Sequence, residues 1–355
     1  MGKLLIFLIL TRITIFFSLF LINNEFVPSV FSERWDGNSY RFITENGYQT
    51  KENAGSEFIV FLPLYPTILR SLNFINLPTA SIAFIVSNTF FVIGSLSLYK
   101  LLLVDYGERF SRKVVASLAL FPTSYFFSVG YPESLFLFTT TASLYLARRN
   151  NFLLGFIFAG LATITRPTGI FLFPTLIYLI LVSKENRLKK LFSATPGLLF
   201  PVYYLLVNYK LHQDFLAFKS FLETFWQKAF DLPWKGIIKS FKLTNYKDWT
   251  LYQKLTIGLG EGLASASGWI FSALAIFLRA EINLAYSVFT ILSVALFTST
   301  GFILSSPRYL LSIFPFFIVL CLLLKNKLIF YAWLVVSSVL LIFYSNHFYL
   351  GHWAF

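Results

Sequence analysis

The chain has 355 residues, of which 57% are hydrophobic and only 13% are charged, and its formal net charge is +13. Soluble domains carry about a quarter charged residues, so this composition excludes a disordered chain and a soluble enzyme with one anchor, and the single cysteine excludes an internal disulfide. Apolar runs of roughly 15 to 25 residues recur along the whole length and predict an all-α polytopic membrane protein. In such a protein, basic residues set the orientation, so we expect no nucleic-acid partner.

The predicted spans begin at the N-terminus. Leu4–Ile22 lacks a small-x-small cleavage site, so we expect a first span rather than a signal peptide. Residues 23–78 form the predicted first extracytoplasmic loop with juxtamembrane helices, in which the proline-broken piece Phe58–Ile75 does not cross. The later predicted spans are Thr79–Val104, Val114–Val129, Ser134–Ala147, Phe152–Thr165, Gly169–Val182, Leu191–Tyr209, Thr256–Leu278, Ile282–Thr300, Tyr309–Leu324 and Leu328–Ser345. The result is one integral-membrane domain, 1–355, with about 11 transmembrane helices.

The distribution of basic residues supports this topology. With the N-terminus inside, the basic clusters fall in short cytoplasmic loops, whereas a crossing by Phe58–Ile75 would move them outside. These residues are Arg109, Arg112, Lys113, Arg148, Arg149, Lys184, Arg187, Lys189, Lys190, Arg279, Lys325 and Lys327. Residues 210–255 then form a long extracytoplasmic loop, whose mixture of lysines and aromatic residues is typical of interfacial helices.

Two predicted helical hairpins are too short to span the bilayer fully. Their legs of about 14 to 16 residues reach only ~24 Å, against roughly 30 Å of hydrocarbon. Their polar turns lie at Gly130–Glu133 and Arg166–Thr168. Polar turns at membrane depth persist only when they are buried in protein or line a watery cavity, so these two turns indicate a site.

Four charged residues lie on the predicted outer side. Asp36 belongs to the first loop, Glu133 and Arg166 to the two hairpin turns, and Arg308 precedes the tenth span. Charges near a membrane are costly, so a group of them indicates a functional site. Structural alternatives stay open: Asp36 could cap a helix, Glu133 could cap a helix or pair with Arg166, and the arginines could extend to the interface.

These residue types suit a substrate linked to phosphate. Guanidinium groups match phosphate oxygens, and a carboxylate in their field can act as the base for an acceptor hydroxyl. The sequence has no glycine-rich nucleotide motif, so a donor presented from the bilayer fits better than a soluble nucleotide sugar. Neither Asp36 nor Glu133 has a partner carboxylate at ligand spacing, so we expect neither a metal nor a cofactor.

An ordered set of motifs also carries a family resemblance. The motifs are Arg34–Gly37 (RWDG), Phe61–Pro66 (FLPLYP), Gly130–Ser134 (GYPES), Thr165–Gly169 (TRPTG), Gln213–Phe218 (QDFLAF) and Pro307–Tyr309 (PRY). Together they resemble the PIG-V family, the GPI mannosyltransferase 2 group of GT-C glycosyltransferases, and particularly its shorter prokaryotic members. Gln213 and Phe215 depart from the glycine and proline that are usual in this family.

The resemblance implies a GT-C membrane fold that transfers a sugar on the extracytoplasmic side. It implies a polyprenyl-phosphate sugar donor, with mannose in the characterised branch, and an inverting reaction in which Asp36 is the base. The acceptor would be a glycan or glycolipid. The abundance of Phe, Ile, Lys and Asn favours a prokaryotic cell membrane, where the protein would be multi-pass and surrounded by membrane lipids.

The remaining site residues receive roles that follow from this reaction. We expect Arg166 and Arg308 to bind the donor phosphate. Glu133 could position the acceptor, orient the first loop or hold Arg166. We also expect substrate contacts from Trp35, Tyr131 and His212. Of the three histidines, His212 has the best chance of a role, but the alternative that it is only a loop residue stays open. These last three assignments complete the predicted site.

Two other function classes stay open. A transporter or flippase of lipid-linked sugars would usually show internal repeats or paired broken helices at mid-membrane. A non-catalytic subunit of a glycan assembly complex would tolerate the loss of Asp36.

Overall fold

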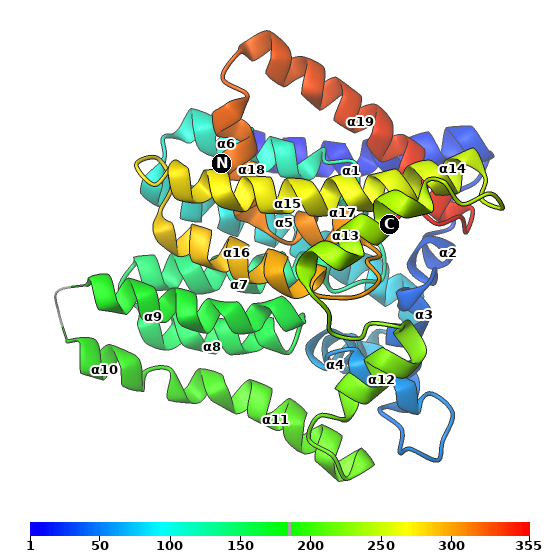
Figure 1. Ribbon diagram of the computed structural model, residues 1–355, viewed down its shortest axis with the longest axis horizontal. Helices are drawn as coiled ribbons and strands as arrows, with labels where there is room; N and C mark the ends of the chain where they lie inside the picture. Colours follow the sequence, from blue (N-terminus) through cyan, green and yellow to red (C-terminus); the bar gives the residue numbers. More distant parts are fainter. Residues whose placement is uncertain (184–185) are drawn as a thin grey trace. The chain divides into compact units, whose positions relative to one another are not determined.

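The computed structural model describes residues 1–183 and 186–355, so Lys184, one of the predicted cytoplasmic lysines, lies outside the described residues. Within these ranges the chain is helical (Figure 1). Its extended pairing there is limited to one antiparallel bridge between Phe230 and Thr300. The predicted all-α class is confirmed.

Several helices have the length and composition of membrane spans. In the described part of the chain, five segments qualify: Gly2–Asn23, Thr79–Asp105, Arg187–His212, Leu251–Phe277 and Lys327–Tyr349. Shorter apolar helices occupy Phe152–Thr163, Pro167–Val182, Leu284–Thr298 and Phe314–Leu323. These helices agree with a multi-pass membrane protein, and the total of about 11 crossings remains a prediction.

The helices form two compact units, each assembled from distant parts of the chain. Unit 1 consists of Met1–Phe26, Asp105–Tyr125 and Gln227–Phe355, and unit 2 consists of Val27–Val104 and Phe126–Trp226. The single domain over 1–355 stays a prediction.

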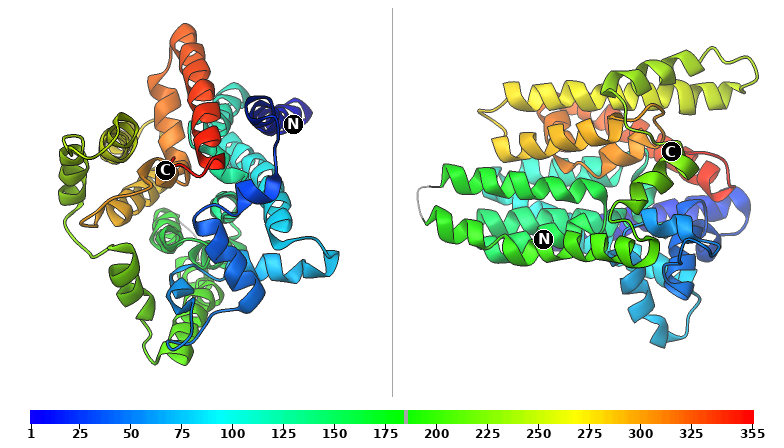
Figure 2. Two further views of the ribbon diagram at one scale, coloured as in Figure 1. Left: turned by 90° about the vertical axis from the view of Figure 1, so that its right-hand side faces the viewer. Right: turned by 60° about the horizontal axis from the view of Figure 1, so that its bottom comes forward.

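Unit 2 contains residues 27–78 of the first predicted loop and both hairpin turns. Its α-helices are α2 (Pro28–Ser32), α3 (Asp36–Asn46), α4 (Leu64–Ser71), α5 (Thr79–Asp105), α7 (Glu133–Arg148), α8 (Phe152–Thr163), α9 (Leu172–Val182), α10 (Arg187–Phe192), α11 (Thr195–His212) and α12 (Ala217–Trp226). Short 3₁₀ turns are η1 (Ser56–Val60), η2 (Asn73–Ile75) and η4 (Pro167–Phe171). Helix α8 is central, because it packs against α7, α9 and α11 (Figures 1 and 2).

A hydrophobic cluster fixes the first loop on the helices of unit 2. Tyr40 and Ile43 of α3, Tyr65 of α4, Ile82 of α5 and Leu135 of α7 are all buried in it. The start of α3 is thereby held beside the start of α7, and these two helix starts carry Asp36 and Glu133.

The segment Phe58–Ile75 folds into short pieces. Its only α-helix, α4, has 8 residues and therefore reaches about 12 Å, with a 3₁₀ turn on either side. Pro63 is the N-cap of α4, since proline has no N–H to donate to a preceding turn. A piece of this length supports the prediction that the segment does not cross as one helix.

Helices α8 and α11 approach closely at two glycines. A Cβ atom built on Gly160 would lie 2.3 Å from the carbonyl oxygen of Gly197, which real atoms cannot tolerate. Close backbone approach at small residues is the usual basis of helix association in membranes. The contact holds α11 against the centre of unit 2.

We expect Gly160→Ala to destabilise the protein by about 1–3 kcal/mol, because the added methyl group forces the two helices apart. The measurement is the thermal unfolding midpoint in detergent. Gly107→Ala is the matched control, because a Cβ there meets nothing within 4 Å. Equal midpoints for the two variants would show that the close approach contributes nothing to stability.

Unit 1 is built from both ends of the chain. Its helices are α1 (Gly2–Asn23), α6 (Glu108–Ala119), α13 (Pro233–Leu243), α14 (Leu251–Gln253), the π-helical η5 (Lys254–Gly260), α15 (Glu261–Phe277), α16 (Leu284–Thr298), α17 (Ser306–Leu311), α18 (Phe314–Leu323) and α19 (Lys327–Tyr349). The 3₁₀ turn η3 (Ser124–Phe127) begins here and continues into unit 2. Helix α15 packs against α16, α17 and α18, and α1 packs against α19.

The predicted span Val114–Val129 is wrong as one continuous helix. Helix α6 ends at Ala119, because the residue before Pro122 disfavours helical backbone. The buried guanidinium of Arg12, in the middle of α1, donates to the carbonyl oxygens of Ala119 at 2.6 Å and Ser124 at 2.8 Å. Arg12 therefore supplies donors to two carbonyl groups at the break, and the Ser124 hydroxyl also donates to the carbonyl oxygen of Ala119.

The predicted span Tyr309–Leu324 is also divided. Helix α17 ends at Leu311 and α18 begins at Phe314, with Pro315 in the first turn of α18. Proline is tolerated at that position and cannot continue a preceding helix. The division leaves α17 as a short helix that carries Arg308.

Candidate active site

Asp36 is the first residue of α3 and follows a strained backbone position. Trp35 has φ 50° and ψ −120°, and the N–H of Gly37 donates to the carbonyl oxygen of Arg34 at 3.0 Å. A positive φ at the second position of such a turn normally requires glycine. In a tryptophan it costs about 1–3 kcal/mol and is typical of functional sites. Trp35 itself, not Asp36, is the N-cap, and no side-chain capping bond is formed.

Gly37 is required where it stands. A Cβ at this position would lie 2.0 Å from the carbonyl oxygen of Ser32. The RWDG motif is therefore folded tightly on the residues that precede it, and the half-buried Asp36 side chain is presented from a fixed backbone.

Tyr131 connects this turn to the first hairpin turn. Its phenol oxygen accepts the backbone N–H of Asp36 at 3.0 Å and donates to the carbonyl oxygen of Arg34 at 3.0 Å. Tyr131 is fully buried and lies two residues before Glu133. The predicted site residues Asp36, Tyr131 and Glu133 are thus brought together within unit 2.

A second hydrogen-bonded chain fixes Tyr131 from behind. The Ser87 hydroxyl donates to the carbonyl oxygen of Tyr131 at 3.3 Å, and the hydroxyl oxygens of Tyr65 and Ser87 lie 2.8 Å apart in a second hydrogen bond. Burial raises the pKa of Tyr65 well above its ordinary value, and the nearby Glu133 charge acts in the same direction. Tyr65 therefore remains a protonated donor over the physiological pH range.

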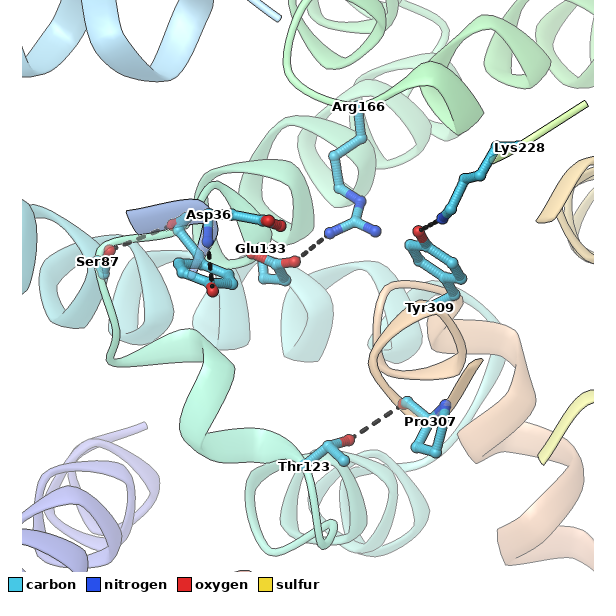
Figure 3. Close-up of polar contacts among 9 residues, drawn as sticks. Asp36, Ser87, Thr123, Glu133, Arg166, Lys228, Pro307 and Tyr309 are labelled. Carbon is cyan, nitrogen blue, oxygen red and sulfur yellow. Dashed lines mark hydrogen bonds and ion pairs between the residues drawn. The ribbon is translucent and has the colours of Figure 1, made fainter. Parts of the chain in front are cut away.

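Glu133 and Arg166 form a buried ion pair that joins the two hairpin turns (Figure 3). The side chain of Glu133 is 0% exposed and that of Arg166 is 9% exposed. Glu133 begins α7, and Arg166 adopts the extended backbone that is expected before Pro167. Of the two structural alternatives expected for Glu133, capping a helix or pairing with Arg166, the structure contains the pairing.

This arrangement joins an acid at a constrained turn to a buried cation through Tyr131 and Glu133. A guanidinium has five N–H groups, so pairing through Nη1 is compatible with binding phosphate as well. In a site shielded from bulk water, such a cation stabilises developing negative charge strongly. The chemistry that fits is proton removal at Asp36 together with stabilisation of an oxyanion at Arg166.

We expect Tyr131→Phe to lower turnover about tenfold, because losing both hydrogen bonds frees the backbone that orients Asp36. Stability should fall by only about 1 kcal/mol. Steady-state transfer kinetics and the unfolding midpoint test this together. Tyr178→Phe, in α9, is the matched control, and an equal loss of turnover in both variants would contradict a positioning role for Tyr131.

The three remaining predicted site residues, Arg308, Trp35 and His212, lie in segments of the chain other than the two hairpin turns. Arg308 is buried in α17, which belongs to unit 1, so its joint action with Arg166 stays a prediction. Trp35 is 48% exposed and can face a ligand. The ring of His212 packs against Phe221 with centroids 5.0 Å apart, and within the described residues neither of its ring nitrogens has a hydrogen-bond partner.

Sequence reasoning missed two charged residues inside predicted spans. Arg12 lies in the first span and Glu261 in the span Thr256–Leu278, and both are buried. A lone charge in an apolar run is itself a signal of function or of a specific partner. Over residues 1–183 and 186–355, no three His, Cys, Asp or Glu side chains are grouped as metal ligands.

Comparisons with known proteins leave the family open. The chain matches no protein-family model, and searches of curated proteins and of solved structures find no significant match. Membership of the PIG-V family therefore stays a prediction from the motifs.

Proposed function

We propose that this protein is a membrane glycosyltransferase of the GT-C type. It moves a sugar, mannose by the family resemblance, from a polyprenyl-phosphate donor to the hydroxyl of a glycan or glycolipid acceptor. The reaction takes place on the extracytoplasmic side of the cell membrane and inverts the anomeric carbon.

One observation carries the proposal. Asp36 stands at a strained turn that is hydrogen-bonded to Tyr131, and Tyr131 lies two residues before Glu133 of the buried Glu133–Arg166 pair. Strained backbone is retained where the surrounding structure compensates for it, and it accumulates at catalytic sites.

In the proposed reaction, the carboxylate of Asp36 accepts the proton of the acceptor hydroxyl. The acceptor oxygen forms a bond to the anomeric carbon while the bond from that carbon to the phosphate oxygen breaks. The electron pair leaves with the polyprenyl phosphate, whose growing charge Arg166 stabilises. The transition state has oxocarbenium character, as in other glycosyl transfers.

Glu133 acts as a positioning residue in this scheme. Of its three expected roles, the ion pair supports the one in which it holds Arg166. A guanidinium that is already fixed in place loses little freedom when the phosphate arrives.

The stereochemistry of the product tests the proposal. Purified protein in detergent is supplied with polyprenyl-phosphate mannose of known configuration and a mannoside acceptor, and the product anomer is read by NMR. Inversion supports a single displacement with Asp36 as base. A product with retained configuration would overturn the scheme. Transfer from a nucleotide sugar, but not from polyprenyl-phosphate mannose, would also overturn it.

A further inference from the structure

A second polar cluster, in unit 1, surrounds the turn that precedes α17. Glu261 of α15 is fully buried, and its carboxylate accepts the backbone N–H groups of Ser305 at 2.7 Å and Ser306 at 2.6 Å. Ser305 has a positive φ of 73°. A buried carboxylate bonded to two backbone amides holds this turn in a conformation that serine rarely adopts.

Two further hydrogen bonds fix the same turn. The Ser265 and Ser306 hydroxyl oxygens lie 2.8 Å apart, and the Thr123 hydroxyl donates to the carbonyl oxygen of Pro307 at 3.1 Å. Arg308 follows directly and is buried. The turn is therefore a rigid platform for the two residues that come next, Arg308 and Tyr309.

Lys228 is held against this platform. Its ammonium donates to the phenol oxygen of Tyr309 at 2.6 Å (Figure 3) and lies 4.9 Å from the centre of that ring. The backbone beside it is also anchored, because the N–H of Gly301 donates to the carbonyl oxygen of Ala229 at 3.2 Å. Lys228 is thus a half-buried cation in a fixed position.

The contacts of Lys228 leave it suited to an external anion. An ammonium has three N–H donors, and Tyr309 takes one of them. Among the residues that the structure describes, no carboxylate forms an ion pair with Lys228. Glu261, which acts on Lys228 electrostatically, directs both carboxylate oxygens to the backbone amides instead. The two remaining N–H groups of the ammonium are therefore available to bind the oxygens of an anionic ligand.

The neighbouring helix indicates where that anion comes from. Helix α13 begins five residues after Lys228, and it exposes Trp234 and Ile238, four residues apart on one face. Exposed tryptophan on a lysine-rich amphipathic helix is typical of the membrane interface. Phosphate groups of lipids occupy that same level.

We propose that Lys228, with Tyr309 and Arg308, forms a phosphate-binding site for a lipid-borne phosphate ester, and that Glu261 positions this site. The inference deepens the proposed function where the ligand is the polyprenyl phosphate. The binding site itself does not require sugar transfer.

Binding of farnesyl phosphate to the purified protein in detergent tests the proposal. Lys228→Gln should raise the dissociation constant about tenfold, which corresponds to one charged hydrogen bond. Lys228→Arg should stay within about threefold of the wild type because it keeps the charge. Lys247→Gln, an exposed lysine in the same segment, is the matched control and should leave the constant unchanged.

Competition identifies the source of the phosphate. Displacement of farnesyl phosphate by phosphatidylglycerol assigns the site to phospholipid headgroups, and resistance to it assigns the site to prenyl phosphates. Either result supports a phosphate site if it depends on Lys228. Equal binding of farnesyl phosphate by the wild type and Lys228→Gln overturns the inference. It is also overturned if inorganic phosphate and sulfate displace farnesyl phosphate equally well from the wild type and from Lys228→Gln.

The readout separates this inference from the proposed function. Weaker binding in Lys228→Gln without sugar transfer by the wild type would keep the phosphate site and remove the glycosyltransferase. Sugar transfer by the wild type with unchanged binding in Lys228→Gln would do the reverse.

Discussion

Replacing Asp36 with asparagine is expected to lower the rate of sugar transfer about 10²–10⁴-fold, the usual loss when a general base is removed. The fold should be retained, because the backbone N–H of Asp36, not its side chain, bonds to Tyr131. Asparagine preserves this bond and the size of the side chain while removing the negative charge. The measurement is the initial rate at saturating donor, together with the elution profile and unfolding midpoint in detergent.

Asp248→Asn is the matched control for this experiment. Asp248 is exposed and lies in the long loop 210–255, so the same chemical change there should leave the rate unchanged. A rate in Asp36→Asn close to that of the wild type would remove Asp36 from the base role. It would also return the non-catalytic subunit to consideration.

Separating the buried ion pair is the second large effect. Glu133→Leu and Arg166→Met should each destabilise the protein by about 3–5 kcal/mol, because each leaves one charge buried without its counterion. The double variant should regain most of the stability, since two apolar side chains of similar volume can replace a buried pair. Unfolding midpoints of the four proteins form a complete double-mutant cycle.

Activity should not follow stability in this cycle. The double variant should remain inactive, because Arg166 would no longer stabilise the leaving phosphate. A stable double variant with wild-type transfer would show that the pair is only structural. Single variants as stable as the wild type would show that the ion pair contributes nothing to the fold.

The long apolar helices could be predicted because their sequences are apolar throughout. The expected span Thr79–Val104 corresponds to α5 (Thr79–Asp105), and Leu328–Ser345 lies within α19 (Lys327–Tyr349). The broken helices could not be predicted in the same way. Hydropathy stays high through Phe121-Pro122 and through Ser312-Ile313, and only the backbone consequences of proline divide them.

The sequence indicated which residues form the candidate site, but it did not indicate most of the hydrogen bonds that join them. The residues Asp36, Glu133 and Arg166 were identified by charge in an apolar setting, and the ion pair was one of several expected arrangements. The positive φ of Trp35 and the two bonds of the Tyr131 phenol depend on how α3 packs on α5 and α7. No local sequence pattern specifies a contact between residues 95 positions apart.

Arg12 and Glu261 also show that a residue can be identified from the sequence while its contacts cannot. The sequence contains the charge in the apolar run, but the partners lie far away. Arg12 bonds to Ser124 across 112 positions, and Glu261 bonds to Ser305 across 44. The presence of a specific partner could therefore be expected, whereas its identity required the fold.

The most direct measurement of the central claim follows a labelled sugar from donor to acceptor. Purified wild type and Asp36→Asn are incubated side by side with polyprenyl-phosphate [¹⁴C]mannose and a lipid extract that supplies acceptors. With the wild type, the account requires that the amount of labelled sugar leaving the donor equals the amount of polyprenyl phosphate released. With Asp36→Asn, it requires that the label stays on the donor. Label that remains on the donor with the wild type, or that moves equally with both proteins, would contradict it.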